Sequence, residues 1–331
     1  MKNLTLKTIY GDYQIKEPLI ELIKTPTIQR LKKISQRGAT EYCSPYEKFI
    51  SRYDHSIGVL VLLIRYNANI KTQIAGLLHD ASHTVFSHVG DFLFKNKDHK
   101  ASYQDKIHEW FLKKQKIDTI LQKYGFSLEE ILHKSGHHKI LEQDLPDICI
   151  DRLEYNLQIG LIEKIINKKN ISEILNNLTF KNGKWFFTEI NIAKKFSEIS
   201  LIMTEKEWGS APNIFSYAKL AKALKKGLEL KIITEHEIHF STDDIIWNKL
   251  ENSKNKEILK YLDQVKNPQK YIKISDKENH DKILYGKFRG INPLIKTEKG
   301  LSRLTDLNQN FSKEYNKVKK IIHNGWYIKY I

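Results

Sequence analysis

Cysteine and long apolar runs are scarce in this chain of 331 residues. Its two cysteines, Cys43 and Cys149, lie far apart and lack metal-type spacing, which excludes a disulfide framework and a zinc ribbon. The longest apolar run, Ile57 to Ile64, is far shorter than the roughly 20 residues that a membrane helix needs. The first residues, Met1 to Thr5, show no apolar segment of a secretory signal. We therefore expect a protein of the reducing cytoplasm that does not insert into a membrane.

Arginine is also rare, although the chain carries a large positive surplus. Lysine and arginine total 55 against 39 acidic residues, a formal charge of +16, yet only seven of the 55 are arginine. Such a surplus suits an anionic ligand, which could be a nucleotide, nucleic acid or a membrane surface. A lysine-rich sequence with much isoleucine and asparagine also arises when a genome is AT-rich. The total charge therefore does not identify the partner, and the fifteen glycines do not cluster as a phosphate-binding P-loop requires.

Apolar periodicity divides the chain into two textures. The first half is mostly helical in pattern, and its expected helical segments are 18–23, 27–33, 56–66, 71–79, 103–114, 128–133 and 147–165. No period of 20 to 50 residues repeats, which excludes solenoids and propellers. The lysine- and asparagine-rich stretch from Lys164 to Glu173 marks the expected boundary. We predict a helical core over residues 1–165.

The second half, residues 166–331, mixes strand and helix patterns. Two alternating segments within 178–188 flank Asn182-Gly183, which is a strong signal for a β-hairpin. The expected helices are 190–203, 213–226 and 313–323, and the expected strands are 271–274, 283–288 and 325–331. The predicted fold class is therefore mainly α, with an α+β C-terminal subdomain that contains a β-hairpin.

The adjacent pair His79-Asp80 ends the apolar run Ile74–Leu78. An imidazole and a carboxylate thus emerge together from a segment that should be buried. An unpaired carboxylate there would cost several kcal/mol, and a bound cation removes that cost. One further histidine, His55, begins another apolar helix, and one further aspartate, Asp151, lies on a third. Ligands from three helices would form a mixed nitrogen and oxygen metal site in a bundle core. The alternative is a set of core histidines satisfied by hydrogen bonds alone.

Three motifs together resemble a known family. They are Arg52-Tyr-Asp-His-Ser-Ile-Gly58, Leu77-Leu-His-Asp-Ala-Ser-His-Thr-Val-Phe-Ser-His88 and Asp151-Arg-Leu-Glu-Tyr155. In this order they resemble the HD-domain phosphohydrolase superfamily and, more narrowly, its deoxynucleotide triphosphohydrolase branch, which includes the sterile-alpha-motif enzymes. The similarity covers roughly residues 7 to 160. Glu154 stands where that branch has a second aspartate, and Ile159 stands where it has the aspartate implied to contact the sugar 3′-hydroxyl.

The resemblance implies a role for each matching residue. The implied metal ligands are His55, His79, Asp80 and Asp151. The implied catalytic residues are His83, His88 and Asp91, and the implied substrate-binding residues are Gln36, Arg52, Arg152 and Tyr155. The resemblance also implies one divalent transition metal (Mn, Fe, Zn, Co or Ni), Mg on the substrate phosphates, and a homo-oligomer.

The chemistry of these residue types agrees with those roles. A divalent metal polarises a phosphoryl oxygen and activates a bound water for attack, and a histidine titrates in the range that proton transfer needs. We therefore expect a metal-dependent phosphohydrolase that acts on nucleotides, similar to a (d)NTP triphosphohydrolase. The alternatives are an HD-type nuclease on single-stranded nucleic acid and a nucleotide-binding regulator.

Overall fold

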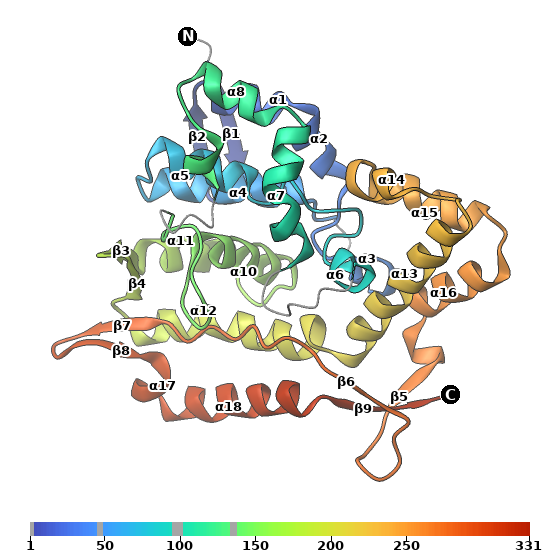
Figure 1. Ribbon diagram of the computed structural model, residues 1–331. Helices are drawn as coiled ribbons and strands as arrows, with labels where there is room; N and C mark the ends of the chain where they lie inside the picture. Colours follow the sequence, from blue (N-terminus) through green and yellow to red (C-terminus); the bar gives the residue numbers. More distant parts are fainter. Residues whose placement is uncertain (1–2, 45–48, 95–101, 133–137) are drawn as a thin grey trace.

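The computed structural model describes residues 3–44, 49–94, 102–132 and 138–331 (Figure 1). Helices dominate the first half, as predicted. They are α1 (Leu19–Lys24), α2 (Pro26–Arg30), α3 (Thr40–Cys43), α4 (Arg52–Arg65), α5 (Ile70–Leu78), α6 (Val89–Leu93), α7 (Tyr103–Lys114), α8 (Ile117–Lys123), α9 (Leu128–Ile131) and α10 (Ile150–Ile162). A hairpin of β1 (Leu4–Thr8) and β2 (Gly11–Ile15), which was not predicted, precedes them.

The second half mixes helices with two small sheets, which confirms the predicted fold class. Its helices are α11 (Lys168–Asn177), α12 (Ile190–Met203), α13 (Ala211–Glu229), α14 (Glu235–Phe240), α15 (Asp243–Asn252), α16 (Lys256–Lys266), α17 (Leu304–Leu307) and α18 (Gln309–Asn324). The strands are β3 (Leu178–Lys181), β4 (Lys184–Phe187), β5 (Ile272–Ile274), β6 (Lys282–Leu284), β7 (Leu294–Thr297), β8 (Gly300–Arg303) and β9 (Trp326–Tyr330).

The strands pair as β3-β4-β7-β8 in one sheet and as β5-β9-β6 in the other. The predicted hairpin is confirmed, because β3 and β4 pair antiparallel around Asn182 and Gly183. Both turn residues have positive φ (52° and 73°), which is the backbone that an Asn-Gly turn favours. The strand expected over 283–288 is shorter and ends at Leu284, because the chain then leaves the sheet and crosses toward α12 (Figure 1).

The helices that position the candidate site are fixed by local sequence. Ser51 caps α4 by accepting a hydrogen bond from the backbone N–H of Asp54, so α4 starts at Arg52 rather than at Ser56 as predicted. Asn69 caps α5 in the same way through Thr72. Both helices then carry buried aliphatic residues on most faces, and α4 packs against α5 and α10. Their packing holds the ends of three helices at one place.

Buried apolar residues form one large cluster that includes Leu6 near the start and Ile322 near the end. Gly160 of α10 lies directly against Ile199 of α12, so apolar contact continues across the predicted boundary near residue 165. Figure 1 shows α12 and α18 running beneath the helices of the first half. A division of the chain into residues 1–165 and 166–331 stays a prediction. Within the described residues, no helix is both long and apolar enough to cross a membrane.

Candidate metal centre and active site

Three helices bring the four predicted metal ligands together. His55 lies in the first turn of α4, His79 and Asp80 directly follow α5, and Asp151 lies in the first turn of α10. Nε2 of His55 is 3.3 Å from Nε2 of His79 and 2.9 Å from Oδ1 of Asp151. Oδ2 of Asp80 is 3.7 Å from Nε2 of His55. Ligand atoms that share one ion at about 2.1 Å lie roughly 3 Å apart, so these separations suit a single cation.

The hydrogen bonds behind the cluster fix which nitrogens face it. Nδ1 of His79 is 2.7 Å from the carbonyl oxygen of Gly76. A carbonyl only accepts, so Nδ1 carries the proton and Nε2 presents its lone pair to the cluster. Nδ1 of His55 is likewise occupied, at 2.5 Å from Oε2 of Glu154. Two imidazoles and two carboxylates are a donor set that suits a divalent transition metal.

Glu154 supports this cluster from behind, a role that the sequence analysis missed. Its side chain is fully buried, and its Oε1 accepts a hydrogen bond of 2.9 Å from the hydroxyl of Tyr10. A Cβ at Gly58 would collide with this carboxylate, so Gly58 leaves the space that Glu154 fills. The available signal was spacing, because a residue three positions after Asp151 shares its face of a helix.

The carboxylates dominate the electrostatics of the cluster. Burial alone would lower the pKa of His55, but Glu154, Asp151 and Asp80 outweigh it and raise that pKa to about 10. Burial would raise the pKa of Asp80, but Arg52 and the neighbouring histidines hold it well below its usual value. Without another cation the imidazole of His55 is therefore positively charged. The cluster is a place where a positive charge is stabilised.

Arg52 lies beside the cluster and is held on several sides. One terminal nitrogen donates to Oδ2 of Asp80 at 2.5 Å, and Nε donates to the hydroxyl of Ser87 at 2.8 Å. The other terminal nitrogen donates to the backbone carbonyl of Gln36 at 3.4 Å. The structure thus brings Gln36 and Arg52 together next to the predicted ligands.

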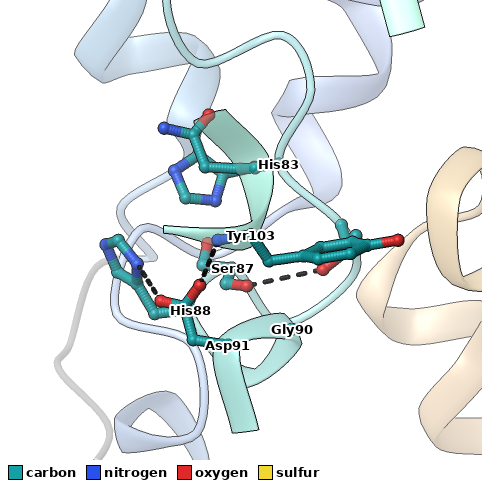
Figure 2. Close-up of a pocket in the computed structure, with 8 residues that line it drawn as sticks. His83, Ser87, His88, Gly90, Asp91 and Tyr103 are labelled. Atoms are coloured by element: carbon teal, nitrogen blue, oxygen red, sulfur yellow. Dashed lines mark hydrogen bonds and ion pairs between the residues drawn. The ribbon is translucent and has the colours of Figure 1, made fainter. Parts of the chain in front are cut away.

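His83, His88 and Asp91 lie on the loop and short helix that follow the cluster, where they line a small pocket with Tyr103 (Figure 2). Nε2 of His83 is 3.2 Å from Oδ1 of Asp80, and its ring centroid is 5.0 Å from that of His88. Nδ1 of His88 is 3.2 Å from Oδ2 of Asp91. Oδ1 of Asp91 accepts the backbone N–H of Tyr103 at 2.6 Å. The structure therefore places all three predicted catalytic residues beside the metal-ligand cluster.

Both histidines of this pocket have pKa values below the ordinary value. Burial and then the charge of Arg52 lower the pKa of His83 to about 3. Its Nδ1 is buried and has no hydrogen-bond partner among the described residues. Burial also lowers the pKa of His88, although a third of its side chain is exposed and Asp91 opposes the shift. Both rings are neutral at pH 7, and Nδ1 of His83 is an unused acceptor.

Asp243, a residue of the second half of the chain, stabilises the loop between His83 and His88. Its carboxylate accepts the backbone N–H groups of Phe86 at 2.7 Å and of Ser35 at 2.8 Å. Phe86 and Ser87 both have positive φ (57° and 54°), a backbone conformation that residues other than glycine rarely adopt. The buried carboxylate thus stabilises a strained turn that sets the spacing from His83 to His88.

Arg152 and Tyr155 are the remaining predicted site residues. Arg152 pairs with Glu142 at 3.0 Å and also donates to backbone carbonyls of the preceding loop. The ring of Tyr155 meets that of Trp208 edge-on at 5.4 Å and lies 6.4 Å from that of His55. Tyr155 therefore borders the cluster, while the guanidinium of Arg152 is already engaged. Ile159 is buried in the core.

Comparisons with known proteins agree with this geometry. Residues 52–166 match the HD domain family. The chain is 34% identical over 325 residues to an uncharacterized protein, YdhJ, of Bacillus subtilis, and the match covers 97% of each chain. It is 25% identical to the metal-dependent phosphohydrolase cns2 of Cordyceps militaris over 75% of this chain and 73% of that protein.

More distant matches point to the same superfamily. The deoxynucleoside triphosphate triphosphohydrolase SAMHD1 of Gallus gallus is 30% identical over 144 residues, which are 37% of this chain and only 23% of that protein. A phosphohydrolase structure from Bacteroides thetaiotaomicron has the same fold, with a TM-score of 0.69 at 16% identity over 93% of this chain and 95% of that one. The chain belongs to the HD-domain phosphohydrolase superfamily and is a metal-dependent hydrolase.

Proposed function

We propose that this hydrolase acts on nucleotides and that its reaction resembles that of a (d)NTP triphosphohydrolase. One observation carries the proposal: the cluster of His55, His79, Asp80 and Asp151 lies directly beside a second set of proton-transfer groups, with His83 only 3.2 Å from Asp80. A site for a cation and neutral histidines next to it are the parts that hydrolysis of a phosphoryl group needs.

In the proposed reaction His55, His79, Asp80 and Asp151 would hold a divalent metal, which would supply Lewis-acid chemistry at the phosphoryl group. Glu154 and the carbonyl of Gly76 orient the two imidazoles for that purpose. These partners act through the histidines and do not touch the substrate.

His88 and Asp91 form the proposed proton-transfer pair. A carboxylate only accepts, so Nδ1–H of His88 donates to Asp91 and Nε2 carries the lone pair. The lowered pKa of His88 keeps this nitrogen unprotonated at pH 7, in the form that accepts a proton. The same nitrogen, once protonated, can return the proton to a leaving oxygen.

The similarity to SAMHD1 supports deoxynucleoside triphosphates as the first substrates to test. Tyr155 beside the cluster supports a flat or ring-shaped group in the ligand. Ile159 is buried and apolar, so no carboxylate from that position reads the sugar. The proposal therefore includes both dNTPs and NTPs.

The experiment is a screen of dNTPs, NTPs, monophosphates and short single-stranded oligonucleotides with added Mn²⁺, read by product chromatography. The double variant His79→Ala/Asp80→Ala should lose at least about 1,000-fold in rate, since three decades correspond to about 4 kcal/mol of transition-state stabilisation.

The chain offers a matched control for this variant. His280-Asp281 is a second His-Asp pair, at the edge of β6 and away from the cluster, and Asp281 is exposed. His280→Ala/Asp281→Ala should retain activity. Metal-dependent turnover by His79→Ala/Asp80→Ala would refute the proposal, and degradation of oligonucleotides without turnover of nucleotides would favour the nuclease alternative.

We also propose that the metal is Mn, Fe, Zn, Co or Ni, with Mg on the substrate phosphates, and that the protein works in the cytoplasm as a homo-oligomer. The nitrogen and oxygen donor set supports the choice of metal. The resemblance to the superfamily supports the oligomer. Elemental analysis of the purified protein and its molar mass by light scattering test these two points.

A further inference from the structure

The segment between β6 and β7, residues 285–293, joins the second half of the chain to the candidate site. Figure 1 shows it drawn out along α12 without regular structure. Its ends are anchored at three points. Gly286 packs so closely on Gly209 that a Cβ there would lie 2.9 Å from the carbonyl oxygen of Gly209. The backbone N–H of Ile291 donates to the hydroxyl of Ser200 at 2.9 Å, and that of Asn292 donates to the carbonyl of Pro146 at 3.1 Å.

These anchors border the site. Gly209 follows Trp208, whose ring packs on Tyr155, and Pro146 lies just before α10, which carries Asp151. The segment therefore spans from one side of Tyr155 to the start of the helix that supplies a predicted metal ligand.

Side chains alternate between the two sides of the extended segment, so Lys287 and Arg289 are expected on the side opposite Phe288. Phe288 packs edge-on against Tyr315 of α18, with ring centroids 5.1 Å apart. Successive side chains of an extended chain point to opposite sides, so Lys287 and Arg289 point away from α18. Gly290 lets the backbone approach Leu201 of α12, which keeps the segment close to the helix.

The charge of Arg289 reaches residues of the site. Burial raises the pKa of Tyr155 to about 12, and Arg289 opposes that rise. Burial lowers the pKa of His88, and Arg289 is among the cations that add to the lowering. The charge of Arg289 also lowers the pKa of Lys287, and Arg152 contributes to the same effect. The charge of Arg289 thus acts on His88, on Tyr155 and on Lys287.

These two cations differ from Arg52 and Arg152 in their pairing. Arg52 is neutralised by Asp80 at 2.5 Å, and Arg152 by Glu142 at 3.0 Å. Among the residues that the structure describes, neither Lys287 nor Arg289 forms an ion pair or a side-chain hydrogen bond. Lys287 and Arg289 repel each other, although the charges of Asp91 and Asp105 partly oppose the effect on Lys287, and an anion with several negative charges relieves that repulsion.

We propose that Lys287 and Arg289 form an anion subsite that binds the phosphate chain of the substrate, beyond the phosphoryl group at the metal-ligand cluster. This inference rests on the proposed function. It names the substrate class more closely: a nucleoside di- or triphosphate, whose chain carries enough charge to engage both cations, rather than a monophosphate. The C-terminal half then supplies part of the substrate site.

The test compares the double variant Lys287→Gln/Arg289→Gln with a control that removes the same charge. Lys296→Gln/Lys299→Gln changes two exposed lysines on the next hairpin. Calorimetry with inorganic tripolyphosphate should show binding about 100-fold weaker in the first variant, since each lost charge-assisted contact weakens binding about tenfold. The control should bind within about twofold of the natural protein, and inorganic orthophosphate should be affected less than tripolyphosphate. For dATP, kcat/KM should fall by a similar factor, with little change for dAMP.

The outcomes separate this inference from the proposed function. Tripolyphosphate binding that is equal in the natural protein and in Lys287→Gln/Arg289→Gln, or absent from the natural protein, overturns the subsite even if nucleotides are hydrolysed. A natural protein that binds tripolyphosphate through these residues but hydrolyses no nucleotide keeps the subsite and refutes the proposed function. Arg289→Lys retains the positive charge, so it should bind tripolyphosphate more tightly than Arg289→Gln does.

Discussion

The two halves of the chain treat the candidate site differently. The first half places its polar groups around the cluster with nearly every one engaged, as the partners of His55, His79 and Arg52 show. The second half touches the site at fewer points. It contributes one buried carboxylate, Asp243, which holds a turn, and two cations, Lys287 and Arg289, that form no ion pair with the described residues.

The difference indicates a division of work that residue numbers alone do not reveal. Groups that must hold a metal need fixed geometry, so they are supplied by helix ends in a packed core. Groups that meet an anionic ligand remain free until it arrives. Residues of both halves therefore contribute to the candidate site, although the sequence pattern divides the chain into a helical first half and an α+β second half.

The variant with the largest expected effect tests whether Asp243, in the second half, stabilises the loop between His83 and His88 in the first half. Asp243→Ala leaves two buried backbone N–H groups, those of Ser35 and Phe86, without an acceptor. We expect the free energy of unfolding to fall by about 2–4 kcal/mol, measured by urea denaturation. Asp244→Ala is the control, because Asp244 is half-exposed and its ion pair with exposed Lys33 is worth about 0–1 kcal/mol; it also accepts a hydrogen bond from the hydroxyl of Thr242. Equal free energies of unfolding for the two variants would show that Asp243 does not stabilise this loop.

A second prediction addresses the support within the first half. Glu154→Gln keeps the size of the side chain but removes the charge that faces Nδ1 of His55. We expect Mn²⁺ to bind 10- to 100-fold more weakly, the usual effect of losing a carboxylate behind a metal-binding histidine. Titration calorimetry measures this, with Glu163→Gln as the control, because Glu163 is exposed and directly follows the same helix. Unchanged affinity would mean that Glu154 only fills space.

A third prediction uses pH to measure how firmly His83 is buried. Its pKa is about 3 in the folded protein and about 6.5 in the unfolded chain. Between these values only the unfolded chain binds the proton, so the folded state loses about 1.4 kcal/mol for each pH unit as pH falls from 6.5. His83→Gln lacks this loss. The natural protein should therefore lose about 2 kcal/mol more than His83→Gln between pH 7.5 and 5.0.

Urea denaturation at the two pH values, with EDTA present, measures the difference. His323→Gln changes an exposed histidine of α18 and should behave like the natural protein. Parallel stabilities of the natural protein and His83→Gln would show that His83 takes up a proton in the folded state as readily as in the unfolded one.

The smallest expected effect concerns Tyr10. Tyr10→Phe removes one hydrogen bond of 2.9 Å to Glu154, so the free energy of unfolding should fall by about 1 kcal/mol. Mn²⁺ affinity should fall less than in Glu154→Gln. Tyr10 lies in the turn of the β1–β2 hairpin, and Tyr13→Phe, on strand β2, is the control. A larger loss of metal affinity in Tyr10→Phe than in Glu154→Gln would show that Tyr10 contributes more to metal binding than Glu154 does.

Local sequence predicted those elements whose signals lie within them. The helix expected over 103–114 matches α7, and that over 190–203 matches α12, because apolar spacing fixes both. The β1–β2 hairpin and the β7–β8 pair were missed because strands this short depend on their partners. Helix α14 had an unused signal, since Thr234 and Glu237 form a capping box at its start.

The candidate site shows the same limit. The spacing of His55, His79-Asp80 and Asp151 on apolar helices predicted a meeting point, and their ligand atoms do converge; their roles stay predictions. Asp243 lies 157 positions from Phe86, so no local pattern connects the two. Arg289 belongs to none of the three motifs. Its charge acts on Tyr155 because of the path that the chain takes after β6, which is decided by packing between distant segments.

The fixed position of Arg52 has a consequence for conformational entropy. A free arginine or lysine side chain loses about 2 kcal/mol of rotamer entropy when it is immobilised. For Arg52 that loss occurs during folding, because Asp80 and Ser87 already hold it. For Lys287 and Arg289 it would occur when the ligand binds. A site with one rigid side and one adaptable side can hold the reacting phosphoryl group in a single position while it accommodates phosphate chains of different lengths.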